Sequence, residues 1–173
     1  EVNIPAFENR GIALADARDY AVVGCVELSI PGRMYGLHDI SMFNMVRCLE
    51  LTLDAHPEGF ASYGELERAL EDTIARYVGL MARGCDTCDL AHRMTSPTPL
   101  LSCLVSDCLA RGLDVTQGGA RYNPSGVQGV GTANLADSLV TLRRGVLGDD
   151  GRGGHVTPLA SWERLKGALG RDW

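Results

Sequence analysis

Two residues with complementary chemistry, Cys25 and Glu27, follow a short apolar run. The run Tyr20–Val23 ends at Gly24, a pattern typical of a buried strand that stops at a turn. In extended backbone, side chains two residues apart point to the same side, so the thiol and the carboxylate are expected to lie together. A thiol beside a proton acceptor can give up a hydrogen atom or act as a nucleophile.

The neighbours of Cys25 distinguish these two uses. A nucleophilic thiol needs a positive partner that stabilises the thiolate, and His38 is the candidate base for that chemistry. The nearest partner in the sequence is instead the acid Glu27, which favours a hydrogen-atom donor. A buried cysteine beside a solvated glutamate is the non-catalytic alternative.

The pair His38-Asp39 comes after a loop that contains a Pro-Gly turn. Asp39 is well placed to cap a helix expected over residues 39–55, where apolar residues recur at helical spacing. A capping residue can also face a pocket, so both residues are candidates for substrate binding.

Cys85, Cys88 and His92 have metal-like spacing and would share one face of a helix. Structural zinc sites usually have four ligands, and the sequence has no second Cys-x-x-Cys. A partly buried thiol face is therefore favoured, and a metal-binding or purely helical module is kept as the alternative function. The other helical cysteines are expected to be core residues: Cys48, Cys103 and Cys108.

Amphipathic segments supply the elements that position these residues. Helices are expected over residues 63–81 or beyond, 100–111 and 132–147, with a last one capped by Thr157. Strand-like runs occupy 20–23 and 113–116, and the glycine-rich segment 117–131 lacks the spacing of a nucleotide-binding loop. Short strands among long helices indicate an α/β fold with parallel strands. The strands are too few to close a barrel, so residues 1–173 are predicted to be one partial domain of a longer chain.

The net charge, the lengths of the apolar runs and the cysteine count argue against several classes of function. The 173 residues carry a formal net charge of −6, which argues against nucleic acid or an anionic membrane as partner. No apolar run approaches the about 20 residues that span a bilayer. The six cysteines show no disulfide framework, and no leader segment is seen, so a cytoplasmic protein with reduced thiols is expected.

Four strings in this sequence resemble the glycyl radical enzymes, the pyruvate formate-lyase-like family. The resemblance spans about residues 10–173, and the strings occur in the order that the family has: Gly24–Glu27, Pro97–Ser102, Asp114–Asn123 and Gly126–Leu139. The resemblance implies a ten-stranded α/β barrel, of which this chain would be a helix-rich part that contains the loop of the thiyl-forming cysteine. It also implies a small-molecule substrate, a homodimer for the full-length enzyme, and a location in the cytoplasm or inside a bacterial microcompartment.

The resemblance further implies a protein-derived glycyl radical, with no cofactor bound directly. A separate activating enzyme that uses S-adenosylmethionine installs this radical. The radical takes a hydrogen atom from the cysteine, and the thiyl then attacks the substrate.

The subclass follows from the residues around the cysteine. Pyruvate formate-lyases proper have two adjacent cysteines, whereas Gly24 precedes Cys25 here. The segment 31–39 most resembles glycerol and propane-1,2-diol dehydratases, although Leu28 and Leu37 replace their usual proline and tryptophan. The resemblance implies a C–O lyase that removes water from a small polyol, with C–N, C–S or C–C lyases as alternatives.

The resemblance assigns a role to each candidate residue. Cys25 abstracts hydrogen from a carbon that bears a hydroxyl, and Glu27 takes the proton of that hydroxyl. Asp39, together with His38, orients the substrate and helps the leaving group depart. Tyr122 is a further candidate for the pocket wall.

One family motif, the Arg-Val-x-Gly-Tyr radical site, does not occur among the 173 residues. We therefore expect this polypeptide to be inactive alone. Electron paramagnetic resonance after incubation with the activating enzyme tests this, and a persistent glycyl radical signal on the 173-residue polypeptide would refute it.

Overall fold

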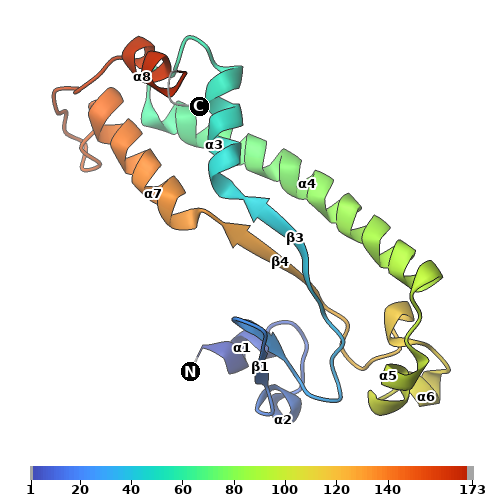
Figure 1. The fold of residues 1–173 in the computed structure, drawn as a ribbon. Helices are drawn as coiled ribbons and strands as arrows, with labels where there is room; N and C mark the ends of the chain where they lie inside the picture. The colour runs from blue at the N-terminus through green and yellow to red at the C-terminus, as the bar shows by residue number, and fades with distance from the viewer. Residues whose placement is uncertain (1, 171–173) are drawn as a thin grey trace. The chain divides into compact units, whose positions relative to one another are not determined.

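The computed structural model describes residues 2–170. They divide into two compact units (Figure 1). The first unit contains the residues up to Met42 together with Ala82–Gln128, and the second contains Phe43–Met81 and the residues from Gly129 onward. None of the helices within residues 2–170 is both long enough and apolar enough to cross a membrane.

The first unit begins with two short helices and a β-hairpin. The helices are α1 (Asn3–Glu8) and α2 (Leu14–Ala17), and the hairpin pairs β1 (Ala21–Val23) with β2 (Glu27–Ser29). The two strands are antiparallel, with Val23 opposite Glu27, so the expectation of parallel strands is wrong here. Residues 24–26 form a tight turn that reverses the chain, and a small core lies beneath: Ile12, Ala17, Ile30 and Met34.

A second two-stranded sheet pairs β3 (Leu37–Asn44) with β4 (Ser125–Val130). The helix expected from Asp39 is therefore wrong over residues 39–44. Helix α3 (Met45–Ala55) begins six residues later, and Asn44 is its N-cap, with its side chain accepting the Arg47 N–H at 3.0 Å. The parallel bridge between Met34 and Tyr122, just before both strands, agrees with the predicted parallel pairing.

The second unit is built on α3, on the first half of α4 (Tyr63–Thr95) and on α7 (Thr132–Thr141). Ser62 and Glu65 have the spacing of a capping box, which predicts the start of α4, and Ser62 Oγ accepts the Glu65 N–H at 3.3 Å. Helix α7 continues as the π-helical turn η2 (Leu142–Val146), which matches the predicted helix over 132–147. The buried core of this unit contains Cys48, Leu49, Leu53, Phe60, Leu66, Leu70, Leu135 and Leu142.

The last helix starts later than predicted. Helix α8 (Trp162–Leu169) is capped by Ser161, whose Oγ accepts the Arg164 N–H at 3.3 Å, so the cap at Thr157 is wrong. The indole N–H of Trp162 donates to the carbonyl of Phe60 at 3.0 Å and so ties this helix to the core of its unit.

The helix predicted over 100–111 is split into α5 (Pro99–Leu104) and α6 (Cys108–Arg111). Val105 takes extended backbone and Asp107 a φ of +77°, neither of which continues a helix. Gly112 closes α6 in the left-handed conformation, as its position predicts. The strand predicted over 113–116 is wrong, because these residues lead into the 3₁₀ turn η1 (Val115–Gln117), which Asp114 caps.

Asp114 connects two of the four strings that resemble the glycyl radical enzymes, Pro97–Ser102 and Asp114–Asn123. Its carboxylate accepts the Thr98 N–H at 2.9 Å and the Ser102 hydroxyl at 2.7 Å, and also the backbone N–H and hydroxyl of Thr116. Burial raises the pKa of the Asp114 carboxyl, but the hydrogen bonds from Thr116, Ser102 and Thr98 outweigh it and bring the pKa to about 2.

Asp114→Asn should destabilise the protein by about 1–3 kcal/mol at pH 7, because one acceptor oxygen becomes a donor that faces other donors. The folded-state pKa lies below the ordinary value of 3.8, so the ionised form stabilises the fold above about pH 4 and this contribution is lost toward pH 2. Urea unfolding of the protein as its gene encodes it, at pH 7 and pH 3, measures both effects.

The matched control is Asp72→Asn, at an exposed position on α4. It should leave the free energy of unfolding nearly unchanged at both pH values. A difference between wild type and Asp114→Asn that does not shrink as the pH falls would contradict the role of the ionised carboxylate.

Candidate active site

Cys25 lies in the turn of the first hairpin and is exposed. The expectation that residues 25–27 form one extended segment is wrong, because residues 24–26 are the turn and Glu27 opens β2. Gly24 has a φ of +63°, which L side chains rarely adopt, so this turn depends on a glycine directly before the thiol.

The side chain of Glu27 nevertheless comes to the cysteine by folding back over the turn. Its Oε2 accepts the Cys25 N–H at 2.8 Å and the Val26 N–H at 3.1 Å. Hydrogen bonds from the backbone N–H groups of Glu27 itself, Val26 and Cys25 lower the pKa of the Glu27 carboxyl, and the charge of His38 adds to the effect. Glu27 is thus held as an ionised proton acceptor beside the thiol-bearing residue.

Two strands, β3 and β4, bring the remaining polar groups to Glu27. The side-chain amide of Gln128, on β4, donates to Glu27 Oε1 at 3.1 Å and also to Asp39 Oδ1, on β3. A cavity of about 230 Å³ lies at this point, lined by Val26, Glu27, His38, Asp39, Gly126, Val127 and Gln128. The predicted residues Glu27, His38 and Asp39 therefore meet at one cavity, next to the turn that holds Cys25.

Two glycines make room for the His38 ring. A Cβ at Gly36 would lie 2.8 Å from His38 Cε1, and one at Gly126 would lie 3.1 Å from His38 Cα. Any larger residue at these positions would push the imidazole away from the cavity.

Tyr122 lines a different cavity of about 620 Å³, which also reaches His38. Its hydroxyl donates to Asp16 Oδ2 at 2.8 Å and accepts the Ala13 N–H at 3.3 Å. The structure thus places Tyr122 in a second cavity that His38 also lines, and not in the cavity of Glu27 and Asp39.

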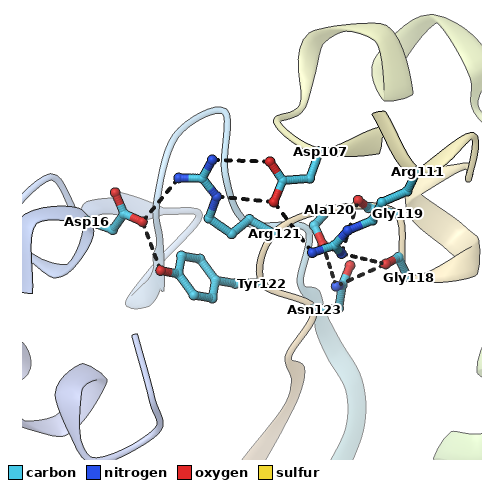
Figure 2. A network of polar contacts seen from close by, with 9 residues as sticks. All are labelled: Asp16, Asp107, Arg111, Gly118, Gly119, Ala120, Arg121, Tyr122 and Asn123. Atoms are coloured by element: carbon cyan, nitrogen blue, oxygen red, sulfur yellow. Dashed lines mark hydrogen bonds and ion pairs between the residues drawn. The ribbon is translucent and has the colours of Figure 1, made fainter. Parts of the chain in front are cut away.

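Figure 2 shows the charged network that surrounds Tyr122. Arg121 forms two hydrogen bonds to Asp107, at 3.1 and 3.2 Å, and an ion pair with Asp16 at 3.5 Å. Arg111 donates to the carbonyl of Ala120 at 2.7 Å. These contacts hold the segment that leads into β4, and so they help to fix the position of the strand that carries Gln128.

The predicted thiol face around Cys85 is only partly present. Cys85 is buried whereas Cys88 is exposed, and His92 lines a separate cavity of about 320 Å³ with Asp86 and Asp89. Within residues 2–170, no cluster of three or more His, Cys, Asp or Glu side chains has a geometry that could hold a metal ion.

The core assignment of the other cysteines is right for two of them. Cys48 and Cys108 are buried, and burial raises the pKa of both thiols. Cys103 is exposed on α5, so its assignment to the core is wrong.

Gln128 was missed from the sequence. It lies in the glycine-rich segment, where no local sequence pattern distinguishes it, and the alternation of half-buried and exposed positions along β4 is seen only in the structure. Gly126, Gln128 and Val130 share the half-buried side of that strand.

Comparison with known proteins agrees with this arrangement. A family model described as pyruvate formate lyase-like matches residues 1–153. The structure resembles the glycerol-bound, B12-independent glycerol dehydratase from Clostridium butyricum, with a TM-score of 0.88, 36% identity and 99% of this chain covered. It also resembles a glycyl radical enzyme from Archaeoglobus fulgidus, with a TM-score of 0.72, 27% identity and 99% of this chain covered.

A curated relative gives the same family. (2S)-3-sulfopropanediol dehydratase from Klebsiella oxytoca is 31% identical over 157 residues, which make up 82% of this chain. The match spans only 19% of that relative, and 22% and 21% of the two structures. The chain, which spans about a fifth of the length of these relatives, folds as a helix-rich part of the glycyl radical enzyme barrel, and it belongs to the pyruvate formate lyase-like family.

Proposed function

We propose that this chain is the thiol-bearing part of a glycyl radical lyase that removes water from a small polyol. The observation that carries the proposal is the ionised Glu27 carboxylate, anchored on the Cys25 N–H and facing a small cavity with His38 and Asp39. The family and the dehydratases among its relatives support the reaction class.

The residues around Cys25 are compatible with a radical centred on its sulfur. Cys25 is exposed in a tight turn, and its immediate partner is a carboxylate rather than a cation that would favour a thiolate. A protein-derived glycyl radical, installed by a separate S-adenosylmethionine-dependent activating enzyme, would supply the unpaired electron. Dimeric assembly of the full-length protein belongs to the same proposal.

The chain's own residues then carry the elimination. The Cys25 sulfur takes a hydrogen atom from a carbon that bears a hydroxyl, so an S–H bond forms and a carbon radical remains. Glu27 takes the proton of that hydroxyl, and the neighbouring C–O bond breaks while Asp39 and His38 hydrogen-bond the departing hydroxyl. The proton held by Glu27 then passes to the departing hydroxyl, which leaves as water. The product radical recovers the hydrogen atom from Cys25, so the net loss is one water.

The test of the function is a substrate panel on the protein as its gene encodes it, activated without oxygen. Glycerol and propane-1,2-diol should yield aldehydes, whereas amino alcohols and sulfonates that lack a vicinal diol should not. Turnover of only the second group would overturn the dehydratase proposal in favour of another leaving group.

Cys25→Ala should abolish turnover, because no other group of the site can exchange a hydrogen atom with the substrate. Cys103→Ala, at another exposed cysteine, is the matched control and should retain wild-type turnover. Steady-state assays with equal glycyl radical content compare the two variants. Residual activity of Cys25→Ala above the uncatalysed background would refute the thiyl role.

Gly24→Ala should lower turnover by about 10²-fold through the position of Glu27. The added Cβ would lie 2.6 Å from Glu27 Oε2, which must then leave the Cys25 N–H. Gly112→Ala places the same strain on a residue with φ of +64° and no neighbour within 4 Å, so it controls for backbone strain alone. Equal losses in both variants would show that strain, and not the carboxylate, is responsible.

A further inference from the structure

The side chain of Gln128 joins two carboxylates that come from different parts of the chain. Its Nε2 donates to Glu27 Oε1 at 3.1 Å and to Asp39 Oδ1. A primary amide nitrogen has two hydrogens, so these two bonds use both of them. Gln128 lies 101 residues from Glu27 and 89 from Asp39 in the sequence, and only the fold brings the three together.

Two carboxylates that converge on one atom repel each other, and such a pair tends to take up a proton on one member. Donors to the charged form counter this tendency. The amide of Gln128 supplies one donor to each carboxylate, adds no charge, and cannot itself titrate in the working pH range. A lysine or arginine would also relieve the repulsion, but it would neutralise the negative charge that the site presents.

The backbone of Asp39 gives a second, independent observation. Asp39, the third residue of β3, has a φ of +62°, a conformation that non-glycine residues seldom adopt in a strand. The unusual backbone directs its carboxylate to the amide of Gln128 instead of along the regular alternation of the strand. A residue with only a packing role would not need this geometry.

We propose that Gln128 is the positioning residue that sets the separation of the Glu27 and Asp39 carboxylates. Its effect on turnover rests on the proposed function, whereas its effect on the two carboxylates does not. The titratable groups that face Glu27 are Cys25 on the turn and His38 and Asp39 on β3, and β4 contributes only the neutral amide.

The variants Gln128→Met and Gln128→Glu test the proposal in the activated protein. Met keeps the length and removes both donors, and Glu adds a third carboxylate. Both should retain the wild-type glycyl radical content but lower kcat/KM by about 10²-fold, since the two carboxylates lose their productive placement.

The pH profile distinguishes positioning from packing. Loss of the donors raises the pKa of Glu27. The rise of kcat/KM with pH, which reports ionisation of Glu27, should therefore move to higher pH in Gln128→Met and further in Gln128→Glu. Gln117→Met is the control, because it removes the bond from the Asp114 N–H to Gln117 Oε1 without touching either carboxylate. It should leave the profile in place.

Crystal structures of the unactivated wild type and Gln128→Met decide the proposal without any assay. The variant is expected to show the Glu27 and Asp39 carboxylates moved apart. Carboxylates that stay in place, or a Gln128→Met pH profile identical to wild type, would overturn the role of Gln128. A wild-type protein that holds the glycyl radical but dehydrates no diol would overturn the proposed function alone, and the crystal structures would still judge Gln128.

Discussion

The pairing of β3 with β4 is the constraint on which the candidate site depends. The ladder starts before the strands, where Tyr35 and Tyr122 donate backbone N–H groups to Tyr122 and Arg33 carbonyls at 3.0 and 3.1 Å, and Leu37 donates to Pro124 at 3.3 Å. Each backbone group that finds a partner here would otherwise have to be satisfied by water or left unpaired. The register that results places His38 against Gly126 and Asp39 within reach of Gln128. A slip by one residue would turn every one of these side chains to the other face.

The charged residues before β4 support that register, although each ion pair contributes little stability by itself. Arg121 binds Asp107 with two parallel hydrogen bonds, and Tyr122 binds Asp16 (Figure 2). Exposed pairs of this kind are worth about 0–1 kcal/mol each. The Tyr122 hydrogen bond and the Arg33 charge lower the pKa of Asp16, and the Arg121 hydrogen bond lowers the pKa of Asp107. These contacts matter for the geometry, because they hold Arg121 and Tyr122 in place just before β4, the strand that carries Gln128.

The sequence predicted which residues lie together better than it predicted the local backbone. Glu27, His38 and Asp39 were identified from their residue types and their order, and they do meet at one cavity. The strand over 37–44 was mistaken for a helix because Met42 continues the helical spacing of α3, and the pairing partner that overrides this pattern lies almost ninety residues away. Local patterns carry no information about such a partner, which is also why Gln128 could not be selected in advance. Among the caps predicted from neighbouring residues, the one at Ser62 is present, whereas Asn44 and Ser161 take the places predicted for Asp39 and Thr157.

The anchoring of Glu27 is an objection to its role as a base, since three backbone donors lower its pKa and make it a weaker proton acceptor. The proposed reaction removes this objection. An alcohol is a very weak acid, and a carboxylate could not ionise it, but loss of a hydrogen atom from the adjacent carbon makes the same hydroxyl far more acidic. A weak, fully ionised base then accepts the proton only after Cys25 has acted, so the order of steps follows from the strength of the base. In the proposed reaction the hydrogen bonds from Cys25 and Val26 would serve two purposes, since they hold the Glu27 carboxylate at the turn and make it too weak a base to react before Cys25.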